Sequence, residues 1–178
     1  SFSNHTGIAP YKPTVQVDFD PMALGRFNAI EYSVLGHVGV TATAFLEGLP
    51  DKINCLDLRT EVAERTQIWR TEKQSRETDD QGTGIASAAL FAALSRHSDD
   101  NAIITVDVGN NAYSFGRYFE VQSQTVLMSG YLGSIGFAFP AAMGAWAAEG
   151  DKRQIVSISG DGGFGQYPME LTTAVKDG

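Results

Sequence analysis

The chain has 178 residues, of which 43% are hydrophobic and 19% are charged. This composition is ordinary for a globular protein of one or two domains, and it excludes collagen-like, disulfide-rich and disordered chains. The sequence holds 21 acidic and 13 basic residues, which gives a formal net charge of −8. Because acidic surfaces repel phosphate-rich partners, we expect neither nucleic acid nor a membrane as a partner.

The chain has a single cysteine, Cys55, so it cannot form an internal disulfide, and we expect this thiol to be a small buried residue. The lack of disulfides fits a reducing compartment, and no apolar run is long enough to span a bilayer. We therefore expect a cytoplasmic protein. The sequence starts at Ser1 without methionine and stops at Gly178 inside an expected helix, so we expect a piece of a longer protein.

The first 55 residues contain two strand-like segments and one helix-like segment. Residues 14–19 alternate apolar and polar side chains, and residues 31–35 form a second short strand-like stretch. Residues 40–49 repeat apolar side chains at helical spacing before Pro50. The shared apolar face of this predicted helix consists of Ala42, Phe45, Leu46 and Leu49.

A densely charged segment with few apolar positions follows. This pattern predicts a solvent-facing helix that leads into a linker, and a turn-rich break follows at residues 78–84. We therefore predict three parts. Residues 1–55 are the end of one domain, residues 56–82 are a charged helix and linker, and residues 83–178 are the first half of a second domain.

The second domain alternates helix-like and strand-like segments. A helix is predicted over residues 85–97, followed by a continuous apolar strand at 102–106, as in strands buried on both faces of a parallel sheet. A strand at 124–128, a helix rich in small residues through 141–148 and a strand at 155–158 follow. This alternation predicts an α/β fold with a parallel sheet.

Each of these three strands runs into a segment rich in glycine and polar residues. These segments, called tips below, are residues 109–111, 130–136 and 160–163. In parallel sheets, ligands bind at the carboxyl ends of the strands. We therefore expect the three tips to converge on one ligand.

The third tip has the sequence GDGG at residues 160–163, and a helix is expected to start at Pro168. Glycines let a phosphate approach the free N–H groups near a helix start. Gly160–Gly165 also fits the dinucleotide pattern G-x-G-x-x-G, but the carboxylate of Asp161 would repel a diphosphate unless a cation lay between them. Asp161 therefore favours a diphosphate bridged by Mg²⁺. The alternative is a tight turn in which Asp161 caps a helix.

Four passages carry a resemblance to a known family. The first joins VQVDFDPMALG (15–25) with SVLGHVGVTATAFLEGL (33–49), and the others are ITVDVGNN (104–111), SGYLGSIGFAFPAAMGA (129–145) and ISGDGGF (158–164). The chain resembles thiamine-diphosphate enzymes of the pyruvate oxidase, acetolactate synthase and pyruvate decarboxylase family. The first passage resembles the end of a Rossmann-like central domain, and the others resemble the front half of the parallel-sheet thiamine-diphosphate-binding domain.

The resemblance implies thiamine diphosphate and Mg²⁺ as cofactors. Asp161 would ligate Mg²⁺, and the Gly133 carbonyl would accept a hydrogen bond from the amino group of the aminopyrimidine. The Ile135 side chain would hold the cofactor in a bent shape that brings this amino group close to the reactive carbon, so Gly133 and Ile135 are the catalytic candidates. The cofactor-binding residues implied by the resemblance are Gly109, Asn110, Asn111, Gly133, Ser134, Ile135, Gly160, Asp161, Gly162 and Gly163.

The implied reaction is the decarboxylation of a pyruvate-like 2-oxo acid, after which the enamine is oxidised, condensed with an acceptor or protonated. The family's activating glutamate belongs to an N-terminal domain, and its second metal-binding side chain lies further along than the 17 residues that follow Asp161. Family active sites also form between subunits. We therefore expect this piece alone to be inactive and the intact enzyme to be a homodimer or homotetramer.

FAD is a further candidate cofactor. In flavin-binding members, an acidic residue matching Asp18 and an aspartate after the glycine matching Gly36 hold the adenosine part. This chain keeps Asp18 but has His37 at the second position, where a neutral histidine could still bond a ribose hydroxyl. Two other functions stay open: an NAD(P)-linked oxidoreductase that uses the Gly160–Gly165 loop, with Asp177 near the ribose, and a non-catalytic nucleotide-binding module.

Overall fold

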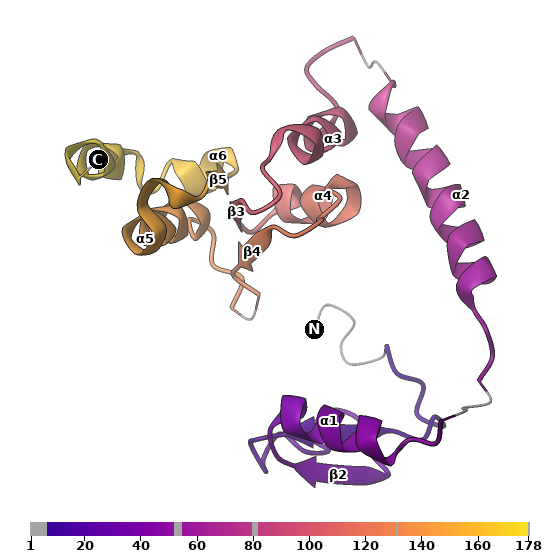
Figure 1. The fold of residues 1–178 in the computed structure, drawn as a ribbon. Coiled ribbons are helices and arrows are strands. Elements are labelled where there is room, and N and C mark those ends of the chain that lie inside the picture. The colour runs from indigo at the N-terminus through magenta and orange to yellow at the C-terminus, as the bar shows by residue number, and fades with distance from the viewer. Residues whose placement is uncertain (1–6, 52–54, 80–81, 131, 178) are drawn as a thin grey trace. The chain divides into compact units, whose positions relative to one another are not determined.

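The fold is presented as a computed structural model, which describes residues 7–51, 55–79, 82–130 and 132–177. The chain divides into two compact units, Ser1–Asp57 and Leu58–Gly178 (Figure 1). Among the described residues, no helix combines the length and the apolar character that crossing a membrane requires. The turn-rich break expected at 78–84 lies partly outside the described residues.

The first unit is built from two short strands and one helix. Strand β1 (Val15–Asp18) pairs in parallel with β2 (Tyr32–Leu35), and helix α1 (Val38–Gly48) follows. The three predicted elements are therefore present. However, no residue of α1 is buried, so its apolar face is not covered within this unit. That the unit belongs to a Rossmann-like domain stays a prediction.

The second unit contains a three-stranded parallel sheet. Its strand order is β4 (Thr125–Met128), β3 (Ile103–Val106), β5 (Ile155–Ile158), so β3 lies in the centre. Ile104 faces Val126 on one side and Val156 on the other. All four residues of β3 are buried, as its unbroken apolar run predicts. The α/β fold with parallel strands is confirmed.

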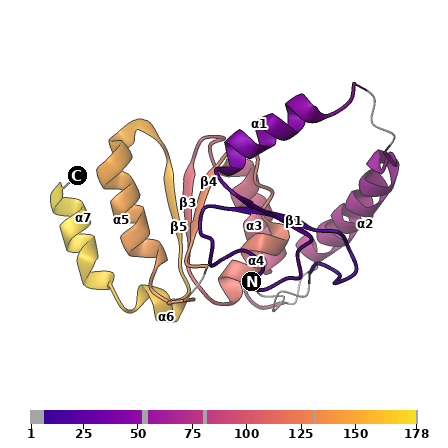
Figure 2. The same cartoon turned by 90° about the horizontal axis from the view of Figure 1, so that it is seen from below.

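Helices cover both faces of this sheet (Figure 2). Helix α3 (Ser87–His97) and helix α4 (Asn110–Tyr118) pack on one face, and helix α5 (Ala138–Glu149) packs on the other. The short helical turns η1 (Gly150–Lys152) and α6 (Asp161–Phe164) flank β5. The turn η2 (Pro168–Glu170) leads into helix α7 (Leu171–Asp177).

The core of the second unit lies between β3 and the helices α3 and α4. Phe115 of α4 packs against Phe91 of α3 with ring centroids 6.0 Å apart, and against Phe119 at 4.7 Å. Ile104 and Val106 of β3 lie beneath these rings and are 0% exposed. The sequence does not predict α4, because its asparagines and glycine have low helix propensity, and aromatic packing stabilises it instead.

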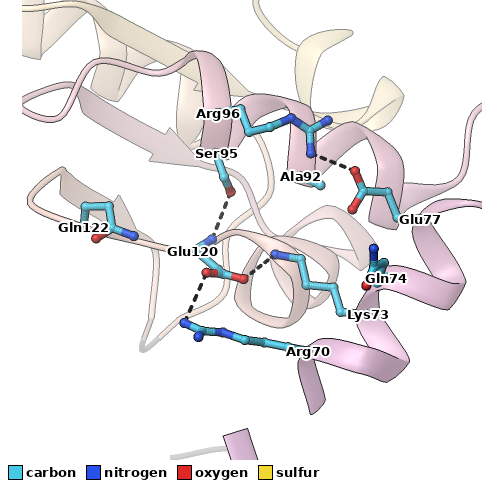
Figure 3. A pocket seen from close by; sticks show the side chains of 9 residues that line it. All are labelled: Arg70, Lys73, Gln74, Glu77, Ala92, Ser95, Arg96, Glu120 and Gln122. Carbon is cyan, nitrogen blue, oxygen red and sulfur yellow. Dashed lines mark hydrogen bonds and ion pairs between the residues drawn. The ribbon is translucent and has the colours of Figure 1, made fainter. Parts of the chain in front are cut away.

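Helix α2 (Arg59–Glu77) packs on α3 and α4 through one side. Trp69 stacks on Tyr118 with ring centroids 6.1 Å apart. Lys73 is only 8% exposed and donates a hydrogen bond to Glu120 at 2.8 Å. The two side chains line a pocket formed by α2, α3 and the segment after α4 (Figure 3). The expectation of a wholly solvent-facing helix is therefore wrong for this side of α2. Cys55, expected to be buried, is exposed.

Candidate functional site

The three tips meet at the carboxyl edge of the second unit's sheet. The Asp107 amide donates to the Ile158 carbonyl at 2.9 Å, which joins the ends of β3 and β5. The Asn111 side chain donates to the same carbonyl at 3.2 Å. The Gly136 amide donates to the Asp107 carboxylate at 2.9 Å, which joins the loop after β4 to the end of β3. The three tips therefore lie at one edge of the sheet, and that they hold one ligand stays a prediction.

The strand order places a topological switch point at this edge. The chain passes from β3 to its neighbour β4 through α4, and then returns across β3 to β5 through α5. The segments after β3 and β5 leave toward opposite faces: α4 lies with α3, while α7 lies beside α5 (Figure 2). Such a switch point, at the carboxyl ends of β3 and β5, is where open parallel sheets bind ligands.

The third tip forms the single helical turn α6. Gly160 takes the N-cap position and Asp161 is the first residue of the turn, so Asp161 is not the cap. Its side chain is exposed and accessible to an ion. A Cβ atom added at Gly160 or Gly162 would meet no other atom within 4 Å, so both glycines face open space. A ligand could therefore approach this backbone closely.

The second tip is an exposed loop with glycines in the left-handed region. Gly133 has φ +69°, and Gly136 has φ +87°. A Cβ atom at Gly136 would lie 2.5 Å from Gln166 Oε1, so only glycine fits there. Ser134 is exposed and Ile135 is 48% exposed, which means that Ile135 is not part of the core.

The first tip is the start of α4. Gly109, with φ +128°, takes the N-cap position, and Asn110 is exposed as the first helical residue. The amides of the first helical turn have no partner within the helix and carry partial positive charge. The Asn111 side chain, in contrast, donates to the Ile158 carbonyl, so it links α4 to β5.

Sequence reasoning missed Asp107 as a site residue. This carboxylate directly follows β3, is 1% exposed and accepts hydrogen bonds from the amides of Val108 and Gly136. The available signal was an acidic residue immediately after a fully apolar strand. A carboxylate in that position is costly to bury unless backbone donors surround it, as they do here.

The residues of this edge fit a diphosphate with a bridging cation. Ser159, beside Gly160, has a buried hydroxyl without a hydrogen-bond partner, which is unusual in a folded protein. Among the described residues, no cluster of three or more His, Cys, Asp or Glu side chains could hold a metal. Asp161 therefore offers a single carboxylate, and Mg²⁺ commonly combines one or two carboxylates with phosphate oxygens. The role of each residue stays a prediction.

The dinucleotide alternative fits this geometry less well. Asp177, the candidate ribose ligand, is the last residue of α7. In dinucleotide-binding folds the acidic residue that holds the ribose follows a second strand of the βαβ unit. The position of Asp177 therefore removes the main support for an NAD(P) site.

In the first unit, His37 has a structural role. Its Nδ1 atom accepts hydrogen bonds from the amides of Gly39 at 3.0 Å and Val40 at 3.4 Å, so the ring caps the start of α1. Asp18 accepts a hydrogen bond from the Asp20 amide at 3.0 Å. Because Nδ1 is used for the cap, His37 could bond an adenosine ligand through its Nε2 atom.

Comparisons with known proteins identify the domain that carries this edge. Residues 107–178 match the thiamine pyrophosphate enzyme C-terminal TPP-binding domain. The chain is 39% identical over 169 residues to the catabolic acetolactate synthase of Raoultella terrigena, covering 91% of this chain and 29% of that protein. It is 30% identical over 176 residues to the acetolactate synthase large subunit of Corynebacterium glutamicum, covering 96% and 27%.

A third relative is the thiamine pyrophosphate-containing protein YdaP of Bacillus subtilis, which is 29% identical over 168 residues, covering 92% of this chain and 28% of that protein. The chain thus spans less than a third of the length of these relatives. The segment matched to the TPP-binding domain begins at Asp107 and includes all three tips. Residues 107–178 are thus identified as part of a thiamine-pyrophosphate-binding domain, and the chain as a whole is similar to a part of acetolactate synthase large subunits.

Proposed function

We propose that the intact protein containing this chain binds thiamine diphosphate and Mg²⁺ at the carboxyl edge of the second unit's sheet. The observation that carries this proposal is the exposed turn at Asp161, where Gly160 and Gly162 face open space at the switch point of the sheet. A carboxylate flanked by open glycines suits a cation bound to phosphate oxygens.

When bound, thiamine diphosphate supplies the electron sink for loss of CO₂ from a 2-oxo acid. Asp161 would hold the cation, and the backbone amides of Gly160 and Gly162 would face the diphosphate. The Gly133 carbonyl would orient the amino group of the aminopyrimidine. The half-exposed Ile135 side chain would pack against the cofactor and keep water from it.

For the complete reaction, we propose condensation of the decarboxylated product with a second 2-oxo acid, in preference to oxidation or protonation. Support comes from the names of the relatives, several of which are acetolactate synthase large subunits. The piece described here would be inactive by itself, because the residues that activate the aminopyrimidine in the family have no counterpart in it. We propose a homodimer or homotetramer for the intact enzyme.

The test is Asp161→Asn in the intact protein, with thiamine diphosphate binding measured by calorimetry with and without Mg²⁺. We expect Mg²⁺-dependent binding in the wild type. The variant should lose more affinity than the roughly 10–100-fold typical for loss of an outer partner of a metal ligand. The control is Asp151→Asn, an exposed aspartate in η1 at the opposite end of β5. Unchanged binding in Asp161→Asn would contradict the proposal.

FAD binding to the first unit is a separate proposal with weaker support. Asp18 is retained, but His37 already uses Nδ1 to cap α1. Denaturing the purified intact protein and identifying the released molecules by mass spectrometry tests both cofactors. Thiamine diphosphate with FAD would support flavin binding, and thiamine diphosphate alone would count against it. Release of NAD(P) alone would contradict the main proposal.

A further inference from the structure

Asp107 is a buried carboxylate at the point where the three tips meet. It follows the central strand β3 and is 1% exposed. Its Oδ1 atom accepts hydrogen bonds from the Val108 amide at 2.8 Å and the Gly136 amide at 2.9 Å, and Oδ2 lies 3.1 Å from the Gly136 nitrogen. A buried charge without such donors would be strongly destabilising.

The other side of this carboxylate is closed by the α6 turn. A Cβ atom added at Gly163 would lie 2.9 Å from Asp107 Cγ and 3.2 Å from the Gly136 nitrogen. The backbone of Gly163 therefore lies directly against the carboxylate, and glycine is the residue that permits this approach. No Lys or Arg among the described residues forms an ion pair with Asp107. Within the described residues, the hydrogen bonds that this carboxylate accepts come from backbone amides.

The loop after β4 depends on this contact. Its residues from Leu132 to Ile135 are exposed, and Gly136 is its buried end. Within the described part of the chain, the hydrogen bonds that anchor residues 132–136 are those from Gly136 to Asp107. Asp107 therefore connects this loop to the end of β3 and to the α6 turn.

We infer that Asp107 is a positioning residue: its buried carboxylate, held between the Gly136 amide and the Gly163 backbone, sets the separation between the Gly133–Gly136 loop and the α6 turn. The inference rests on the proposed function, which assigns the aminopyrimidine end of the cofactor to the loop and the diphosphate end to the turn. Asp107 touches neither end. It fixes the distance that one ligand must span.

The substitution Asp107→Asn isolates this role, because asparagine has nearly the same shape as aspartate. Its carbonyl oxygen can still accept from Val108 and Gly136. Its NH₂ group would then replace Oδ2, which lies 3.1 Å from the Gly136 nitrogen and against the Gly163 backbone. Because this NH₂ donor would face the Gly136 N–H donor, the loop and the turn should move apart.

The experiment compares wild type and Asp107→Asn of the intact protein with two probes, thiamine diphosphate and inorganic diphosphate, each with Mg²⁺, by calorimetry. We expect thiamine diphosphate affinity to fall by about 10-fold or more, because the two ends of the site would no longer match the span of the ligand. Inorganic diphosphate occupies only the α6 end, so its affinity should change by less than about twofold. Asp100→Asn is the matched control, since Asp100 is exposed and precedes β3 at the opposite edge.

Equal weakening of both probes would overturn the inference, because it would show a local or global folding effect. Unchanged thiamine diphosphate affinity, or failure of inorganic diphosphate to bind the wild type, would also overturn it. Failure of thiamine diphosphate to bind the wild type would instead contradict the proposed function. If Asp107→Asn does not fold, Gly136→Ala tests the same contact from the loop side, since a Cβ at its φ of +87° strains the backbone that donates to Asp107. The same selective loss of thiamine diphosphate affinity is expected there, and equal weakening of both probes would overturn the inference.

Discussion

The two units of this chain place similar local patterns in different surroundings. In the second unit, β3 is buried along its whole length, and all buried hydrophobic residues of the described chain lie in this unit. In the first unit, Phe45 and Leu46 occupy the predicted apolar face of α1 but are 50% and 70% exposed. An amphipathic helix gains most of its stability from packing, which α1 does not obtain within its own unit.

The number of strands and covering helices differs between the two units. In the second unit, three strands with helices on both faces bury Ile104 and Val106 completely. In the first unit, two short strands and one helix leave Val15 and Tyr32 exposed. Two-stranded sheets are marginal in water. The first unit therefore needs a covering surface that its described residues do not supply.

The largest loss of stability is expected for Ile104→Ala in the 178-residue chain. Ile104 is 0% exposed in the central strand, so the cavity should lower the free energy of unfolding by about 2–5 kcal/mol. Urea unfolding followed by far-UV circular dichroism measures this. The matched change is Leu46→Ala in α1, which should stay within about 0.5 kcal/mol because Leu46 is exposed.

An equal loss of unfolding free energy for both substitutions in the 178-residue chain would contradict the difference between the two units. The same Leu46→Ala substitution in the intact protein then tests whether α1 is covered there. A larger loss there would show that the apolar face of α1 is covered in the whole protein, whereas an equally small loss would show that it is not.

A smaller effect is expected where α2 joins the second unit. The hydrogen bond from Lys73 lowers the pKa of Glu120, with further lowering by the charges of Lys73 and Arg70 and opposition from burial. Because the folded pKa is lowered, this contact stabilises the fold above the ordinary glutamate pKa. Its contribution is lost as pH falls through the lowered value. We therefore expect α2 to loosen on acidification.

Trp69 reports this loosening, because it stacks on Tyr118. The measurement is Trp69 fluorescence against pH in a Trp146→Phe background. Glu120→Gln should remove the part of the acid transition that belongs to this contact. An identical transition with and without Glu120→Gln would show that the Lys73–Glu120 pair does not hold α2 in place.

The smallest effect is expected at the α1 cap. His37→Ala removes the acceptor for the Gly39 and Val40 amides, and loss of such a cap typically costs about 1 kcal/mol. Hydrogen exchange of these two amides in the intact protein should become faster. His37→Asn supplies an alternative capping oxygen and should restore most of the protection. Unchanged exchange in His37→Ala would show that the ring does not cap the helix.

Local sequence patterns predicted most elements of this fold to within a few residues. The apolar run at 102–106 became β3 at Ile103–Val106, and the alternating segment at 14–19 became β1 at Val15–Asp18. Local patterns did not predict α4, which is stabilised by the packing of Phe115 against Phe91 of α3 and against Phe119. They also failed for Lys73, a charged residue that is buried by contacts with Glu120.

The sequence by itself determined the parallel α/β fold and the three tips, because strand periodicity and glycine-rich turns are local properties of the chain. It also contained the resemblance that the comparisons confirmed. Only the tertiary structure decided that Asp107 joins the loop at Gly136 to the turn at Gly163, since these residues are far apart in sequence. It also decided that the face of α1 stays exposed, because burial depends on which elements meet in space and not on the pattern within one element.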